Sequence, residues 1–249
     1  MNTISEVLQR LEAIIQECRA EQSALGYFPA LYYRMTQAVQ TGIDQGVFEN
    51  GARMEQLDVR FAQRYIDAYD AYRAGKPMTQ SWQLAFEAAK DDNITVFQHL
   101  MLGMNAHINL DLGIAAAQTR TRDAIFGLHD DFNKINDVIR HLVDPMQEKL
   151  AEIWLPFRLL DRLLRTEDEG WINFSIDVAR GAAWKSATML AFAPDMQAEK
   201  KLIQDFDVVV ASIGKGVLHP GFWISSGLWL MRRWEKGTVE EKINVLLAP

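Results

Sequence analysis

One segment of the chain carries a histidine and an aspartate at a spacing that suits metal binding or acid–base chemistry. His107 and Asp111 lie four residues apart in ITVFQHLMLGMNAHINLDLGIAAAQ, residues 94–118. Residues four apart are neighbours on one face of an α-helix. An imidazole and a carboxylate placed in this way can share a metal ion, or the carboxylate can orient the imidazole as a general base. This pair is the first candidate site.

The same segment carries three further polar residues. His99 precedes His107 by eight residues, roughly 12 Å along a helix axis, so it needs a partner of its own to support or complete a metal site. Asn105 and Asn109 form a second pair on roughly the opposite side. The alternative is a purely structural hydrogen-bond network, because buried polar groups are usually paired with one another and specify helix packing.

Three residues elsewhere are candidates for a catalytic role. Asp131 is either a third ligand beside His107 and Asp111 or the cap of a helix. Arg34 and Arg180 lie among apolar residues on predicted helices, where a guanidinium would bind an anionic substrate group or form a salt bridge to an acid such as Asp111 or Asp131.

These residues together predict a metal-assisted hydrolase as the leading function. A divalent ion, zinc or manganese, would be held by His107 and Asp111 with support from His99, and it would activate water for attack on a small or lipid-like molecule. A second interpretation is a helical binding or scaffold protein in which the polar residues form a core network and have no catalytic role.

The elements that must position these residues are helices. The segment from about 93 to 118 is apolar on almost every side, which is typical of a central helix surrounded by others. Helical periodicity recurs along nearly the whole chain, and no convincing run of alternating strands appears. We therefore expect an all-α fold, with residues 1–249 forming a single globular domain of roughly ten helices around this buried helix.

Composition limits the possible partners. The chain is 49% hydrophobic and 24% charged, with a formal net charge of −7. An acidic chain without a basic patch disfavours nucleic acid as a partner. Cys18 is the single cysteine, which excludes an intrachain disulfide and a cysteine-based metal site. We find no signal peptide and no transmembrane segment, so a cytoplasmic protein is expected.

The C-terminal part contains an aromatic and basic segment, GFWISSGLWLMRRWEKG, residues 221–237. Tryptophans next to arginines on one helix are typical of a segment at a lipid interface. A helix packed on the rest of the protein or a surface joining two copies in a homo-oligomer would have the same composition. The residues concerned are Trp223, Trp229, Arg232, Arg233 and Trp234.

The central segment also carries a family resemblance. QHLMLGMNAHINLDLGIAAA, residues 98–117, resembles the signature of an uncharacterised, largely bacterial family of all-helical proteins. The resemblance extends over most of the chain, through YYRMTQAV (32–39), FAQRYIDA (61–68), DDFNKIN (130–136) and ARGAAW (179–184). It implies a shared fold and directs attention to the central helix, but it implies no reaction.

A more distant similarity concerns the zinc-dependent phospholipase C and P1 nuclease group. Those all-helical hydrolases hold a metal cluster with His-x-x-x-Asp or His-x-x-x-Glu pairs, and GMNAHINLDL is similar to their helix motif. The present chain departs from them in having only five histidines and an N-terminal Met-Asn in place of the liganding tryptophan. The similarity implies one or two metal ions and not a full trinuclear site.

Overall fold

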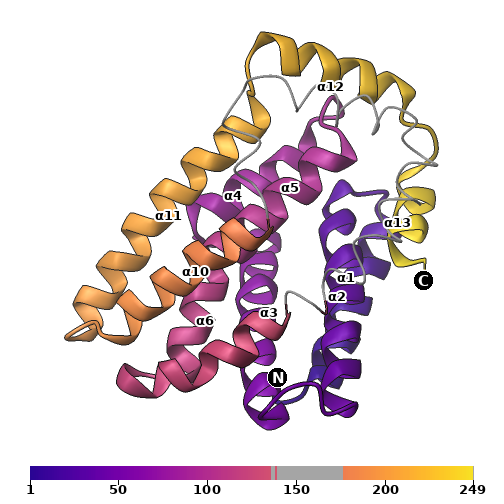
Figure 1. The fold of residues 1–249 in the computed structure, drawn as a ribbon. Helices are drawn as coiled ribbons and strands as arrows, with labels where there is room; N and C mark the ends of the chain where they lie inside the picture. The colour runs from indigo at the N-terminus through magenta and orange to yellow at the C-terminus, as the bar shows by residue number, and fades with distance from the viewer. Residues whose placement is uncertain (136–137, 139–175, 249) are drawn as a thin grey trace.

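The computed structural model describes residues 1–135, 138 and 176–248, and in this part of the chain the ordered elements are helical, with no strand. The all-α fold expected from the sequence is thereby confirmed. Figure 1 shows the helices arranged around α5 and α6 in the middle of the molecule. The α-helices with their bounds are α1 (Ile4–Ala20), α2 (Tyr27–Asp44), α3 (Gly51–Arg73), α4 (Gln80–Glu87), α5 (Val96–Ala106), α6 (Leu112–Thr119), α10 (Ile176–Ala191), α11 (Met196–Leu218), α12 (Phe222–Trp234) and α13 (Val239–Leu247).

The central helix is a composite of three pieces. It begins at Val96 because Thr95 and Gln98 form a reciprocal capping box, three residues later than the sequence suggested. A single π-helical turn, η3 (His107–Asp111), joins α5 to α6. Such turns interrupt α-helices mostly at functional sites. The predicted central helix therefore exists, but the candidate pair lies on a distorted turn within it.

Small residues let the neighbouring helices approach the central segment closely. A side chain at Gly103 of α5 would collide with the Phe28 ring of α2, with its Cβ 2.3 Å from the nearest ring atom. On α6, a Cβ at Gly113 would lie 3.0 Å from the carbonyl oxygen of Ala183 in α10. The side chains of Ala115 and Ala116 are fully buried. These contacts place α2, α3 and α10 around η3.

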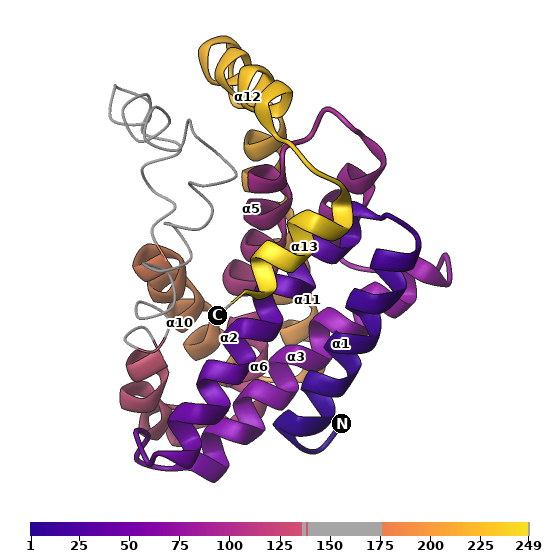
Figure 2. The same ribbon diagram turned by 90° about the vertical axis from the view of Figure 1, so that its right-hand side faces the viewer.

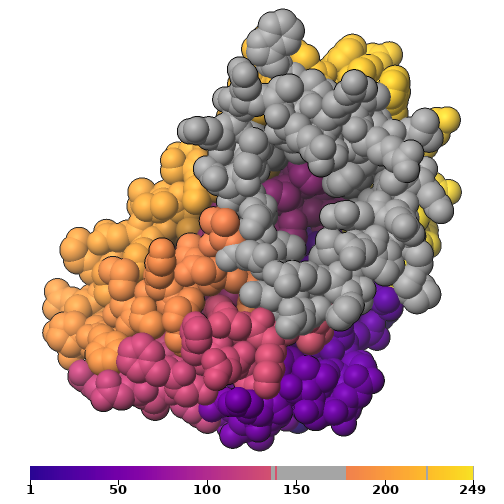
Figure 3. All heavy atoms as spheres, viewed as in Figure 1, coloured from indigo at the N-terminus to yellow at the C-terminus, as the bar shows by residue number. Residues whose placement is uncertain are grey.

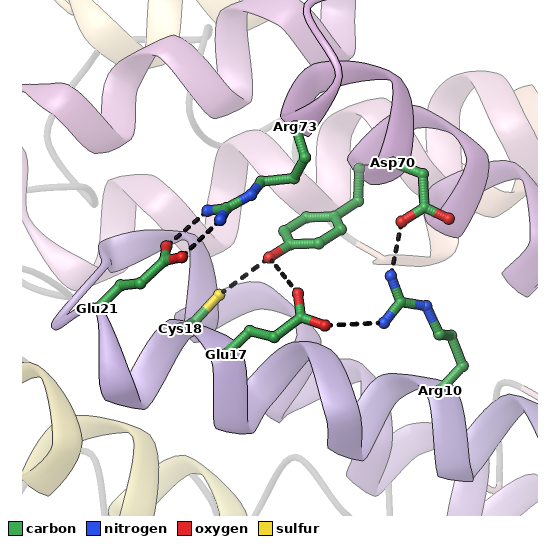
Figure 4. A network of polar contacts seen from close by, with 7 residues as sticks. Arg10, Glu17, Cys18, Glu21, Asp70 and Arg73 are labelled. Carbon is green, nitrogen blue, oxygen red and sulfur yellow. Dashed lines mark hydrogen bonds and ion pairs between the residues drawn. The ribbon is translucent and has the colours of Figure 1, made fainter.

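The N-terminal helices form one wall of the molecule, where α1, α2 and α3 lie side by side (Figure 2). Polar contacts also join α1 to α3, where the hydroxyl of the buried Tyr69 lies 3.6 Å from the Cys18 sulfur and 3.3 Å from a Glu17 carboxylate oxygen, next to ion pairs at the surface (Figure 4). Exposed ion pairs contribute little individually, so the register of α1 on α3 depends mainly on buried apolar side chains. The remaining members of this surface network are Arg10, Glu21, Asp70 and Arg73.

The C-terminal helices return to the start of the chain. α12 lies across one end of the molecule, and α13 packs beside α1 and α2 in both ribbon views (Figures 1 and 2). Ile243 of α13 is fully buried, against residues that include Ile15 and Tyr27. Glu235, between α12 and α13, accepts a hydrogen bond of 2.9 Å from the backbone amide of Val96 at the start of α5.

The helix that starts at His129 packs against α10 through the rings of His129 and Trp184, and it also meets the turn between α2 and α3. Figure 3 shows this part of the chain between α10 and the N-terminal region. Asp131 makes the contact with the turn: its carboxylate accepts hydrogen bonds from the backbone amides of Glu49 and Asn50 at 2.7 and 3.1 Å. None of the described helices combines the length and apolar character that crossing a membrane requires.

Candidate functional site

The structure brings His107 and Asp111 together on η3. The ring nitrogen Nδ1 of His107 lies 3.6 Å from the carboxylate oxygen Oδ2 of Asp111, slightly beyond hydrogen-bond length. Both side chains are buried, with exposed fractions of 3% and 1%. The i, i+4 spacing read from the sequence therefore corresponds to a real pair in the core.

Both oxygens of Asp111 are already engaged by other residues. Arg64 of α3 donates from Nε to Oδ1 at 2.6 Å, and the indole of Trp82 in α4 donates to Oδ2 at 2.7 Å. Burial by itself would raise the pKa of Asp111, but the Arg64 charge and these hydrogen bonds outweigh it and hold the pKa below its usual value. Asp111 is thus a fixed carboxylate in an ion pair with Arg64.

The ring of His107 is enclosed by aromatic side chains. It stacks on Phe61 at a centroid distance of 3.5 Å and meets the Tyr32 ring edge-on at 4.4 Å. Burial lowers the pKa of His107 below its ordinary value despite the nearby Asp111, so the ring is neutral at neutral pH. Because Nδ1 faces a carboxylate, we assign the single proton to Nδ1, which leaves Nε2 as an acceptor.

A largely apolar pocket lies between α2, α3, the central segment and α10, and His107 forms part of its wall. We call it the His107 pocket. Its volume is about 630 Å³, including the part that is open to solvent. The apolar walls come from Phe28, Met35, Val39, Leu57, Phe61, Met104, Ile108, Leu112 and Ile135, and the polar groups from Tyr32, Thr36, Asp58, His107 and Arg180.

Several of these polar groups lack a hydrogen-bond partner. The hydroxyls of Tyr32 and Thr36, the Oδ2 oxygen of Asp58 and both ring nitrogens of His107 are buried and make no hydrogen bond within 3.5 Å to any residue that the structure describes. Buried polar groups are nearly always satisfied, and each unsatisfied one costs about 1–3 kcal/mol. Four such side chains line one pocket, so its described wall contains polar atoms that the described residues leave unsatisfied.

Asp58 is the most unusual of these groups. Its side chain is buried on α3, and burial, with a smaller repulsion from Glu55, raises its pKa to about 7. The environments of Asp58 and Asp111 thus shift their pKa values in opposite directions.

The other predicted metal ligands lie apart from this pair. His99 is buried beside the ring of Tyr27 at 5.6 Å, where burial and the positive charges of Arg232 and Lys242 lower its pKa to about 4. Asp131 connects the start of α3 to the helix at His129, and it receives a further hydrogen bond of 2.7 Å from Arg53. Asp131 therefore has a structural role as a hydrogen-bond acceptor and as the ion-pair partner of Arg53, although the cap of α3 is Asn50 and not Asp131.

The two predicted arginines differ in position. Arg180 lies in the wall of the His107 pocket, where its guanidinium covers the Phe132 ring at 4.5 Å and donates to the Phe132 carbonyl oxygen. Arg34 is half-buried on α2 and does not line the pocket. The structure thus brings Arg180, but not Arg34, toward His107.

Sequence reasoning missed Tyr32, Thr36 and Asp58. Tyr32, Met35, Thr36 and Val39 follow the i, i+3, i+4, i+7 spacing of one helix face, and all four line the pocket. Asp58 lies next to the buried Leu57 and three residues before Phe61, in a register that should face the core. The position of Asp58, an acidic residue on the helix face that should be buried, was the sequence feature that could have identified it as a candidate site residue.

Among the described residues, no group of three or more His, Cys, Asp or Glu side chains is arranged to hold a metal ion. The predicted zinc or manganese site remains a prediction. The aromatic C-terminal segment is likewise only partly described: Trp229 and Trp234 of α12 are half-exposed, and the side chain of Trp223 lies outside the description.

Fold and site together define an all-α protein with an enclosed pocket beside a distorted central helix. A family model matches residues 4–220, so the chain belongs to a family of unknown function (DUF5995). The family resemblance read from the sequence is thereby confirmed. No curated protein and no solved structure matches the chain.

Proposed function

We propose that the protein binds a small, largely apolar molecule with at least one polar group in the His107 pocket. The observation that carries this proposal is a set of buried polar side chains in the wall of one pocket that have atoms without a hydrogen-bond partner among the described residues: Tyr32, Thr36, Asp58 and His107. A ligand that satisfies them recovers the free energy lost on their burial, while its apolar part replaces water against Phe61 and neighbouring side chains.

His107 is the group best suited to chemistry on the bound molecule. Its Nε2 is a neutral acceptor, its Nδ1 faces the fixed carboxylate of Asp111, and Asp111 is held by Arg64 and Trp82. A base oriented by a carboxylate is the arrangement used in proton abstraction. The same geometry serves simple binding, with Nε2 accepting a hydrogen bond from the ligand.

Metal-assisted hydrolysis, the specific function predicted from the sequence, needs a larger rearrangement of the described side chains than simple binding does. Nε2 of His107 is available to a metal ion, but Asp111 would have to leave its hydrogen bonds to Arg64 and Trp82. Elemental analysis of the purified protein, repeated with His107→Ala, tests this function. Stoichiometric zinc or manganese that is lost in His107→Ala would support it.

Binding can be tested with three amphiphiles that share one chain: octanol, octylamine and octanoate. We expect at least one of them to bind in calorimetry and, at roughly 100 times its Kd, to raise the melting temperature by about 5–10 °C. Leu57→Phe, which fills the pocket, should weaken this binding about tenfold or more, since the added ring occupies ligand volume.

Two comparisons make the test specific. Leu230→Phe on α12, where the side chain is 44% exposed, is the matched control and should leave binding unchanged. Thr36→Val keeps the side-chain shape but removes an unpartnered hydroxyl, so it should weaken binding without lowering the stability of the free protein. If none of the amphiphiles binds, or if Leu57→Phe binds like the wild type, the pocket is not a ligand site.

A further inference from the structure

Asp58 is a buried carboxyl group without a counter-ion. Its side chain is 6% exposed, no hydrogen bond to it is formed within the described residues, and the one charge that acts on it noticeably is the repulsive charge of Glu55. A buried carboxylate is stable only when a cation or several donors accompany it. Among the described residues, no group that would favour the ionised form of Asp58 accompanies it.

Arg180, the cationic side chain among the described residues of the pocket wall, does not fill this role. Arg180 covers the Phe132 ring and donates to the Phe132 carbonyl oxygen. It is also not among the groups that shift the pKa of Asp58, which are burial and Glu55 alone. The position opposite Asp58 thus remains available to a positive charge supplied by a ligand.

The remaining wall of the pocket suits the same kind of ligand. The rings of Phe28, Tyr32 and Phe61 line it, and aromatic faces attract a cation when water is excluded. The unpartnered oxygens of Tyr32 and Thr36 and the Nε2 of His107 are acceptors for N–H donors. A protonated primary amine has three such donors.

We propose that the ligand of the His107 pocket is an amine, whose ammonium group pairs with Asp58 and whose apolar part lies against Phe61 and Leu57. This inference rests on the proposed binding function and deepens it. An uncharged alcohol of the same shape would satisfy the hydroxyls but leave Asp58 without a counter-ion, whereas a carboxylate would add a second negative charge beside it.

If an amine binds in this way, its binding should release a proton from Asp58. Near or below pH 7, Asp58 is largely protonated in the free protein, so the binding of an ammonium group ionises it and releases its proton to solvent. The titratable groups around Asp58 are Tyr32 on α2, His107 on η3, Arg180 on α10 and Glu55 on α3. Calorimetry at pH 6 in two buffers of different ionisation enthalpy measures the released proton.

The decisive experiment measures the affinity of the full-length protein for two pairs of ligands that have the same shape. The pairs are octylamine with octanol, and phenethylamine with phenethyl alcohol. In the wild type at pH 8, each amine should bind about tenfold or more tightly than its alcohol. Asp58→Asn keeps the shape of the side chain and should abolish both this preference for amines and the proton release. Asp67→Asn, an exposed position on the same helix, is the matched control.

The outcomes separate the two proposals. If the alcohols bind as tightly as the amines, the amine assignment is overturned while the pocket remains a ligand site. If the preference for amines survives in Asp58→Asn, Asp58 is not the counter-ion. If neither amines nor alcohols bind, the binding function itself fails.

Discussion

Asp58 and Asp111 are both buried near His107, yet their surroundings favour opposite protonation states. Asp111 receives donors from Arg64 and Trp82 and stays ionised, whereas Asp58 receives none and has a pKa of about 7. The difference between the two pKa values comes from the hydrogen-bond and ion-pair partners of the carboxyl groups. It does not come from the extent of burial, because both side chains are almost fully buried. One carboxyl group is therefore committed to holding the structure, and the other is free to act on a ligand.

At the residue scale, this difference predicts a pH-dependent stability of the ligand-free protein. The pKa of Asp58 is about 7 in the folded state and near 3.8 when unfolded, so the native state binds the extra proton between these values. The resulting stabilisation is complete below about pH 4 and is lost as the pH rises through 7. Asp58→Asn is always neutral and should be more stable than the wild type by about 2–4 kcal/mol at pH 8, with the difference reduced to about half or less at pH 5 and nearly absent at pH 4.

Urea unfolding of both proteins at pH 5 and pH 8 measures this effect. The buried histidines His99 and His107 have lowered pKa values, so their stabilisation is present above about pH 6.5 and lost in acid. Their contribution is common to both proteins and cancels in the comparison. A stability difference that does not change with pH would show that Asp58 is ionised in the free protein.

At the scale of the elements, the pocket depends on the close approach of α2 and α5. Gly103 makes this approach possible, because the Phe28 ring occupies the space of a side chain there. Phe28 in turn forms part of the pocket wall and packs against the ring of His107 at 5.6 Å. The distance between two helices therefore sets the width of the site.

Gly103→Ala should consequently reduce both stability and binding. Although alanine favours helix, the new methyl group forces Phe28 to move, and we expect a net loss of about 1–3 kcal/mol in unfolding free energy. Gly181→Ala on α10 is the control, since no atom lies within 4 Å of its added Cβ. That variant should be neutral or stabilised by up to about 1 kcal/mol. Equal effects of the two substitutions would exclude helix packing as the cause.

At the scale of the whole molecule, the C-terminal helix belongs to the core although it follows the part matched by the family model. That match ends at residue 220, whereas α13 buries Ile243 and Leu246 against α2 and the start of α5. Gly26 lies directly under Ile243, which leaves no space for a side chain there. The last helix therefore supports the region from which Phe28 and Tyr32 reach the pocket.

Ile243→Ala tests this role. Removing a fully buried isoleucine side chain should cost about 2–5 kcal/mol of unfolding free energy. Lys236→Ala, at an exposed position before α13, should change stability by no more than about 0.5 kcal/mol. Chemical denaturation of both variants gives the comparison. A cost below 1 kcal/mol for Ile243→Ala would mean that α13 contributes little to the fold.

Much of the architecture follows from local patterns in the sequence. The apolar periodicity and the central position of residues 93–118 are properties of neighbouring residues, and they predicted the all-α fold and the pairing of His107 with Asp111. The start of the helix at Val96 and the π-turn were not predicted, because a competing cap at Thr95 and the packing of η3 against other helices decide them.

His107 and Asp111 show which features of the site the sequence determines and which it does not. Their spacing determined that the two side chains would be neighbours, since helix geometry requires it. Only the tertiary structure decided that Arg64 and Trp82 engage Asp111, that His99 lies apart, and that Asp58 faces the pocket without a partner. These outcomes depend on side chains that are distant in the chain and meet only after packing, and burial then determines which of them remain charged.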